Sequence, residues 1–554
     1  MIKILIPILF LLTAFSYAGS TMLSNNFSYS VPHYSVTVRD INLSEVRLLE
    51  EEGFLIEWAH GGKAMIYVDS QQEEMLRYMG FNPLPVPVPV PIVPYPELWE
   101  IYSSIDAVVA AHPDICRKVT IGTSVEGRPI EAVVVTDNPS IEEIEPEMRI
   151  SGGIHGDEKT GVMTTLNYLE VLTDNYATSP MCQYIVENSE TWIIPILNPD
   201  GYEYNNRYNA NGIDLNRNLS YMGPGSGGGS TAFSEPETQA LRDLTMQDWP
   251  MVKNFINPFA GGLSLHGGAA CINTVWNYAE VPLPEDSGLI HQQAIDYAAV
   301  PGIVSYFGGG FWIAYPGASW YIIHGDVNDW SYGECGTVDH TIEVHDDKQA
   351  SDWPGVANAH YMATLLFFTK STYGIWGTVT NTSGNPVDAL LEIGIDTGTD
   401  SEPLRFCRTD VTLGDYHKTL LPGTYDVIVT ADGYTSQSVE NVTLSSQERV
   451  EVSFVLSGLG IEGSEESPEG VFSVSPNPSQ ESCSFAIPQP GVGGTVSIYD
   501  ITGRSIIVMD VSPVTENLVW SLRNSDGSEV PSGMYIARYS AGASSWNAMV
   551  IVNK

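Results

Sequence analysis

Proline occupies nearly every second position between Pro83 and Pro96. Because proline has a fixed φ and no backbone N–H, such a run excludes a helix and a central β-strand. The segment is therefore predicted to be an extended, semi-rigid spacer. It separates a small N-terminal unit, residues 19–82, from the rest of the chain. With 554 residues in total, the chain is too long for a single domain.

The chain begins with the features of a signal peptide at residues 1–18. Lys3 precedes an apolar run from Ile4 to Phe15, and the small residues Ser16 and Ala18 mark a cleavage site. The apolar run is too short for a membrane span, and no later segment approaches the required length. We therefore expect a soluble protein that is secreted or attached to the cell surface and has no transmembrane segment.

The charge balance excludes one large class of partners. Lys and Arg number 24 against 67 Asp and Glu, which gives a net charge of -43. Such a surface repels phosphate backbones, so we expect no binding to nucleic acid. The 16% of charged and 43% of hydrophobic residues are typical of folded domains rather than of a disordered acidic chain.

Secondary-structure patterns divide the remainder into further units. In residues 97–372 helix-like and strand-like runs alternate, which predicts an α/β domain with a mixed sheet and sites at the strand ends. Residues 373–458 contain short strands and turns and predict an all-β sandwich. Residues 459–470 are a glutamate-rich, acidic linker, and residues 471–554 are again all-β. Residues 19–82 read as a small α/β unit, for which a pro-segment is favoured over a plain folding appendage.

A histidine and a glutamate follow a predicted strand at the start of the α/β region. After the β-like run that ends at Ile150, two glycines introduce a turn that carries His155 and Glu158. The spacing places an imidazole and a carboxylate on one side of the turn, where both can reach one cation. Zinc accepts nitrogen and oxygen ligands in this way. Taken alone, a chance pairing in a surface loop explains the spacing equally well.

Further groups in the same region supply the chemistry that peptide hydrolysis at a C-terminus requires. His266 ends a likely strand, and Glu343 places a carboxylate in an apolar strand at a cost in free energy. A zinc with three protein ligands leaves one position open for water, and a nearby carboxylate can move protons. A cation must meet the oxyanion, and an arginine suits a terminal carboxylate because of its bidentate fork. The other groups are Asn198–Tyr202, Arg207–Asn218, Trp320-Tyr321 and Asp329–Tyr332.

These motifs resemble those of the zinc metallocarboxypeptidases of the carboxypeptidase A/B/E type, over residues 97–370. The resemblance implies one Zn²⁺ held by His155, Glu158 and His266. It also implies Glu343 as general base and acid and Arg207 as the oxyanion-stabilising group. Substrate would be bound by Asn216 and Arg217, which clamp the terminal carboxylate, and by Tyr321, which closes over it.

The resemblance also suggests which terminal residues the pocket accepts. In related enzymes that prefer Lys or Arg, an acidic group stands eleven residues after the histidine ligand or directly before the Asp-Trp pair. Asn277 and Asn328 occupy these positions here, which predicts a preference for neutral terminal residues. An insertion after His266 would instead bring Glu280 into the acid's place.

The flanking regions show resemblances of their own. Residues 19–82 are similar to bacterial carboxypeptidase pro-segments, and residues 373–458 to transthyretin-like, regulatory-like domains. Residues 471–554 resemble the C-terminal sorting domains of type IX secretion, through Ser475–Pro478, Tyr499–Arg504 and Ser532–Tyr535. We therefore expect a secretion machinery as a partner of the C-terminal domain. An FlgD-like immunoglobulin module that packs or adheres is the alternative.

The overall prediction is a secreted zinc carboxypeptidase that acts on peptide or protein C-termini. Three alternatives are a cell-wall peptidase that trims peptidoglycan stems, a non-catalytic peptide-binding or adhesive protein, and an amidohydrolase such as a succinyl-amino-acid deacylase. A free-carboxylate clamp at Asn216 and Arg217 disfavours the first, and retention of the whole set disfavours the second. Tyr321 and the signal peptide disfavour the third. In an exported protein a disulfide between Cys271 and Cys335 is also expected.

Overall fold

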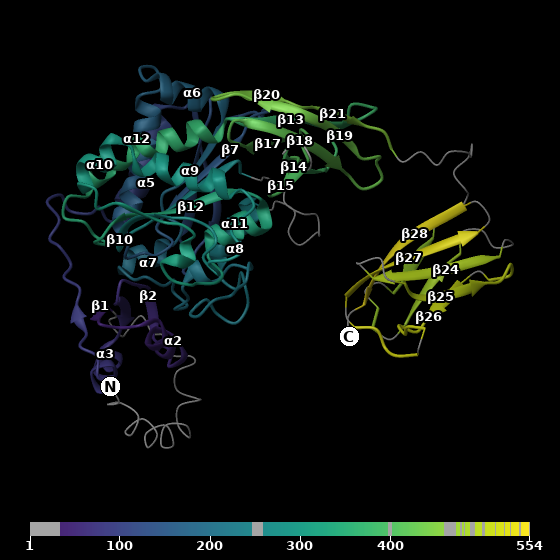
Figure 1. The fold of residues 1–554 in the computed structure, drawn as a ribbon, viewed down its shortest axis with the longest axis horizontal. Helices are drawn as coiled ribbons and strands as arrows, with labels where there is room; N and C mark the ends of the chain where they lie inside the picture. The colour runs from purple at the N-terminus through teal and green to yellow at the C-terminus, as the bar shows by residue number, and fades with distance from the viewer. Residues whose placement is uncertain are drawn as a thin grey trace. The chain divides into compact units, whose positions relative to one another are not determined.

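The computed structural model describes residues 34–245, 259–396, 401–458 and, with short gaps, 472–552 (Figure 1). The predicted signal peptide and the acidic linker lie outside the described residues, as do parts of the three motifs that resemble sorting domains. The chain divides into two compact units, residues 1–459 and 460–554, and each is described by itself. No helix in the described part is long and apolar enough to cross a membrane.

The N-terminal unit is a small antiparallel sheet with two helices. Asn42 starts the first helix through a capping box with Glu45, and Gly61 and Gly62, both at positive φ, form the tight hairpin between two strands. The sheet order is β2-β3-β1-β4. The elements are β1 (Tyr34–Arg39), α2 (Leu43–Glu51), β2 (Leu55–His60), β3 (Lys63–Val68), α3 (Ser70–Tyr78) and β4 (Leu84–Pro85).

The proline-rich segment runs extended beyond β4, as predicted. Its first residues pair only at the edge of the N-terminal sheet, where the missing N–H of proline does no harm. Farther on, the backbone N–H of Ile92 donates to Ser351 and the Trp353 indole donates to the carbonyl of Val93. The spacer is therefore attached to the surface of the following domain.

An eight-stranded mixed sheet forms the centre of the following α/β domain, in the order β11-β10-β12-β9-β7-β8-β6-β5. Its four central strands, β12, β9, β7 and β8, are parallel. The strands are β5 (Cys116–Thr123), β6 (Pro129–Val135), β7 (Glu147–Gly152), β8 (Glu190–Ile194), β9 (Gly261–His266), β10 (Ala269–Asn273), β11 (Trp312–Ala314) and β12 (Val338–His345). Parallel strands bring their carboxyl ends to one edge, which is where sites form in such sheets.

Helices cover both faces of this sheet, so the side chains of its central strands are buried on both faces almost throughout. Val133 and Val135 of β6 pack into the core with α4, α5 and α12, whereas Ala132 and Val134 pack into the core with α8 and α11. The helices are α4 (Leu98–Ala111), α5 (Lys159–Asp174), α6 (Pro180–Asn188), α7 (Pro199–Tyr204), η2 (Leu215–Arg217), α8 (Pro236–Thr245), α9 (Ser287–Ala298), α10 (Pro301–Phe307), η3 (Gly317–Ser319), α11 (Val327–Cys335) and α12 (Trp353–Ser371).

Two sheets follow α12 and form the predicted sandwich. One has the order β17-β13-β20, with β21 also pairing with β13, and the other has the order β15-β14-β18-β19, with β16 pairing with β14. Lys418 of the sandwich donates to Asp286 at the start of α9, over 3.0 Å. The strands are β13 (Gly374–Asn381), β14 (Leu390–Asp396), β15 (Ser401–Pro403), β16 (Cys407–Arg408), β17 (Asp415–Thr419), β18 (Gly423–Thr430), β19 (Gln437–Leu444), β20 (Arg449–Glu451) and β21 (Phe454–Leu456).

The second compact unit is also built of β-strands. Its sheets have the orders β22-β23-β26 and β25-β24-β27-β28, around a core that includes Phe485 and Trp520. The strands are β22 (Ser473–Ser475), β23 (Cys483–Ala486), β24 (Gly494–Asp500), β25 (Ser505–Val511), β26 (Asn517–Trp520), β27 (Gly533–Ala541) and β28 (Ser544–Val552).

The expected disulfide between Cys271 and Cys335 is wrong, because both residues are free, buried thiols. Cys271 belongs to a small cluster with Ala314 and Trp320, whereas Cys335 ends α11 in the core on one face of the sheet. Each cysteine lies near a site residue in the sequence, but the fold does not bring the two thiols together. A disulfide needs Cα atoms within about 7 Å and converging side chains.

Candidate active site

The turn after β7 carries the first two candidate ligands. Gly153 has a φ of +62°, and a Cβ on Gly156 would lie 1.9 Å from the backbone carbon of Gly201, so only glycine fits here. The chain then enters α5, and Glu158 stands at the N-terminal cap of this helix. This tight path directs the His155 and Glu158 side chains toward each other, with 2.9 Å between His155 Nδ1 and Glu158 Oε1.

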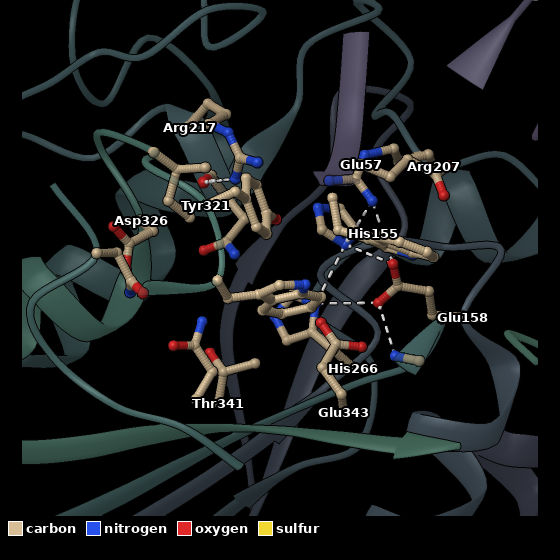
Figure 2. A pocket seen from close by; sticks show the side chains of 18 residues that line it. Glu57, His155, Glu158, Arg207, Arg217, His266, Tyr321, Asp326, Thr341 and Glu343 are labelled. Carbon is tan, nitrogen blue, oxygen red and sulfur yellow. Dashed lines mark hydrogen bonds and ion pairs between the residues drawn. The ribbon is translucent and has the colours of Figure 1, made fainter. Parts of the chain in front are cut away.

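His266 completes this group from a neighbouring strand. It is the last residue of β9, which runs parallel to β7, so both strands deliver their side chains to the same edge of the sheet. His266 Nδ1 lies 3.0 Å from Glu158 Oε2 and 3.2 Å from His155 Nδ1 (Figure 2). All three side chains are buried.

This arrangement fits a zinc ion. The three residues offer ligand atoms that lie within 4.8 Å of one another, and their closest separations of 2.9 to 3.2 Å are close to the roughly 3.4 Å between neighbouring ligands of a tetrahedral zinc. His155 Nε2 lies 3.0 Å from Asp214 Oδ1, which keeps the ring proton on Nε2 and directs the Nδ1 lone pair inward. Two ring nitrogens that face each other beside a carboxylate are a donor set for a cation.

Asp214 is a functional candidate to which the sequence analysis assigned no role, although it begins the Asp-Leu-Asn-Arg-Asn motif. Its carboxylate accepts from Arg207 and lies against His155. Although burial opposes the shift, Arg207 and His155 hold the pKa of Asp214 well below its ordinary value. Asp214 therefore orients both a ligand and the neighbouring guanidinium.

Replacing Asp214 by Asn should weaken zinc binding by about 10- to 100-fold, because the imidazole loses its anionic partner. Competition for zinc with a chelator of known affinity measures this effect. Asp243→Asn is the control, since Asp243 is largely exposed and pairs only with Arg242. Equal zinc affinity of Asp214→Asn and the wild type, with the fold intact by circular dichroism, would contradict the orienting role.

Glu343 lies beside the ligand group on the adjacent parallel strand. Glu343 on β12 pairs in register with His266 on β9. One carboxylate oxygen, Oε2, is buried and has no hydrogen-bond partner among the described residues. Burial and the nearby Glu158 carboxylate raise the pKa of Glu343 well above its ordinary value. An enclosed carboxylate with a free oxygen and a raised pKa is suited to exchanging protons with a bound molecule.

Two arginines enter the pocket from the loop after α7. Arg207 donates to Glu158 Oε1 over 3.2 Å and is fixed by Asp214. Arg217 donates to the carbonyl of Asn216, and it counteracts the effect of burial, which raises the pKa of Tyr321 to about 12. Figure 2 shows Arg217 and Tyr321 side by side, away from Glu158. The pocket is lined by the predicted oxyanion-stabilising Arg207 and by four of the five predicted substrate-binding residues, Asn216, Arg217, Tyr321 and Asn277.

The remaining specificity candidates lie elsewhere. Asn328 is buried, but its side chain hydrogen-bonds to Asn273 and Thr341 and does not line the pocket. Glu280 is exposed and also outside the lining. Asp326, which the sequence analysis overlooked, does line the pocket (Figure 2). Its Oδ1 accepts from Asn277, and its Oδ2 is buried without a hydrogen-bond partner in the part of the chain that the structure describes.

The N-terminal unit also contributes to the pocket wall. Glu57 and Trp58 of β2 line the pocket together with the ligand group. Lys348, in the loop after β12, donates to Glu57 Oε1 over 2.6 Å and to Asp157 Oδ2 over 2.9 Å. The ring of Tyr67, on β3, meets the ring of Tyr208 edge-on. The two parts of the chain therefore meet directly over the candidate active site.

Comparisons with known proteins agree with this geometry. Residues 101–367 match the zinc carboxypeptidase family, residues 374–457 the carboxypeptidase regulatory-like domain, and residues 473–553 the secretion system C-terminal sorting domain. The chain is 28% identical to carboxypeptidase D of Homo sapiens over 388 residues, which cover 65% of this chain and 26% of that protein. It thus spans about a quarter of the length of that relative.

Two further relatives match over most of their own length. The carboxypeptidase N catalytic chain of Homo sapiens is 29% identical over 403 residues, which cover 62% of this chain and 81% of that protein. The crystal structure of the carboxypeptidase A from Helicoverpa armigera superposes with a TM-score of 0.50 at 17% identity, covering 62% of this chain and 98% of that one. This last likeness concerns the fold, and the mixed sheet and its covering helices are the expected architecture.

Proposed function

We propose that the protein is a zinc metallocarboxypeptidase that removes the last residue of peptides or proteins, because residues 101–367 match the zinc carboxypeptidase family. One observation carries this proposal. A buried donor set of two imidazoles and a carboxylate shares a pocket with Glu343, Arg207 and the Asn216–Arg217 pair.

Each residue of the pocket has a defined task in this reaction. His155, Glu158 and His266 hold the zinc, which when bound acts as a Lewis acid toward water and the scissile carbonyl. Glu343 accepts a proton from the attacking water and passes it to the leaving amine. Arg207 faces the oxygen on which negative charge develops, and Asp214 keeps its guanidinium in place. Asn216 and Arg217 bind the terminal carboxylate, and Tyr321 beside Arg217 closes that end.

Glu343 and the Asn216–Arg217 pair argue against two of the alternatives. A non-catalytic adhesive protein has no use for an enclosed proton carrier such as Glu343 beside a metal site. A cell-wall peptidase that cuts inside a stem peptide has no use for an arginine and an amide that match a free carboxylate. We therefore favour the release of single residues from free C-termini.

A panel of peptides that differ only in the last residue tests the proposal. The zinc-loaded chain should release free amino acids one at a time, and excess chelator should abolish the release. Added zinc should restore it. Cleavage at internal bonds, or release that persists after complete removal of zinc, would contradict the proposal.

We also propose that the N-terminal unit is an inhibitory pro-segment. Glu57 and Trp58 form part of the pocket wall, so the N-terminal unit restricts the space that a peptide can occupy. The proline-rich spacer exposes Val88 and Val90, where a protease can cut. The full-length chain should therefore be less active than the chain cut in this spacer.

The C-terminal sorting domain points to export. We propose that it directs passage through a type IX-like secretion machinery after an N-terminal signal peptide has brought the chain into the envelope. Deletion of residues 471–554 should leave peptide hydrolysis unchanged, because the catalytic groups lie in the other compact unit. The deleted chain should fail to reach the surface or medium of its own host. Normal delivery would favour an adhesive module.

A further inference from the structure

The strand that enters the pocket is locally irregular. In a regular strand consecutive side chains point to opposite faces, so Glu57 and Trp58 could not both face one pocket. The register between β2 and β3 shifts between Ile56 and Trp58, which makes Glu57 the extra residue of a β-bulge. Both side chains line the pocket as a result. Bulges commonly redirect side chains beside active sites, and this one delivers a carboxylate.

That carboxylate is held by a lysine of the catalytic domain. Lys348 Nζ lies 2.6 Å from Glu57 Oε1 and 2.9 Å from Asp157 Oδ2, and only 14% of its side chain is exposed. Although burial opposes the shift, Asp157 and Glu57 raise the pKa of Lys348, so its charge persists. The stem of Lys348 runs alongside Gly268, which lines the pocket.

Glu57 lies where the upstream part of a bound substrate is expected to pass. Figure 2 shows Asp326 on one side of the pocket and Glu57 on the other, with His155 between them. In the proposed function the terminal residue of the substrate lies at the end of the pocket that holds Asp326 and Arg217. The residues that precede the scissile bond must then extend past the ligand group toward the place of Glu57.

We propose that Lys348 forms a cationic subsite for an acidic side chain of the substrate upstream of the scissile bond, and that Glu57 occupies this subsite as an intramolecular substitute. Departure of the N-terminal unit removes Glu57, a residue of the pocket wall, from Lys348 and leaves Asp157 as its ion-pair partner among the described residues. A glutamate or aspartate side chain of a peptide can then pair with Lys348 in place of Glu57. The subsite rests on the proposed function, because it assumes that a peptide lies along the pocket.

The test uses the full-length, zinc-loaded chain with Glu57→Gln, which removes the competing carboxylate without changing the shape of the side chain. Peptides carry Glu or Gln at each of the three positions before an identical last residue. We expect kcat/KM to favour Glu by about tenfold at one position, the value of a charge-assisted hydrogen bond in a partly buried site. Adding Lys348→Met should remove this preference, and adding Lys348→Arg instead should retain it.

The control is Lys370→Met, since Lys370 has an ion pair of its own with Asp296 on another part of the domain. This change should leave the Glu-to-Gln ratio as it was. A ratio within twofold at all three positions, in a chain that cleaves the Gln peptides, would overturn the subsite and leave the proposed function intact. If no peptide is cleaved even after the chain has been cut in the proline-rich spacer, the proposed function fails. Binding of the same peptides, followed by tryptophan fluorescence, then decides the subsite: tighter binding of Glu peptides supports it and equal binding refutes it.

Discussion

Replacing Glu343 by Gln is expected to lower kcat by about 10³-fold while zinc content and peptide affinity stay close to those of the wild type. The amide has the size and shape of the carboxylate but cannot accept a proton from water. Glu343 adjoins the ligand group without belonging to it, because the three buried ligand atoms come from His155, Glu158 and His266. Loss of the carboxylate should therefore slow the chemical step without weakening the binding of zinc or peptide.

Steady-state kinetics, together with the zinc content of the purified protein, measure this effect. Glu280→Gln is the matched control, because Glu280 is exposed and does not line the pocket. Activity of Glu343→Gln within about tenfold of the wild type would remove Glu343 from the mechanism. An unchanged kcat with a raised KM would mean instead that Glu343 binds the substrate equally well in the ground state and in the transition state.

The second large effect concerns the terminal residue that the pocket accepts. The two amides at positions 277 and 328 predict a preference for neutral residues, but Asp326 alters this expectation. Its Oδ2 atom is buried at the pocket wall, and no described residue donates a hydrogen bond to it, which is costly unless a ligand supplies one. A terminal Lys or Arg places a cation in the same end of the pocket. We therefore expect efficient release of Lys and Arg.

Replacing Asp326 by Asn should lower kcat/KM for peptides that end in Lys or Arg by about 10²-fold and change it little for peptides that end in Leu. Asn can still cap α11, as Asp326 does by accepting from the backbone N–H of Asp329. Asn328→Asp is the control, since Asn328 lies outside the pocket lining. A wild-type preference of tenfold or more for Leu over Lys and Arg would restore the neutral pocket and assign Asp326 a structural role.

Much of the site was accessible from the sequence because its chemistry is carried by short, contiguous patterns. His155 and Glu158 share one turn, His266 ends a predicted strand, and Asn216 and Arg217 are neighbours. Local spacing and backbone type decide where such side chains point. The alternation of helix and strand likewise indicated a sheet with sites at its strand ends, and the parallel order of β12, β9 and β7 brings these pieces together.

Only the tertiary structure decided which remaining groups share the pocket. Asp326 and Asn328 are two residues apart, yet the cap of α11 leaves one at the pocket wall and ties the other to Asn273 and Thr341. Cys271 and Cys335 lie near site residues in sequence but in separate cores. Glu57 and Lys348 are 291 positions apart, and their ion pair depends on a bulge and on the docking of two domains. Such contacts form between surfaces that folding brings together, and no spacing along the chain encodes them.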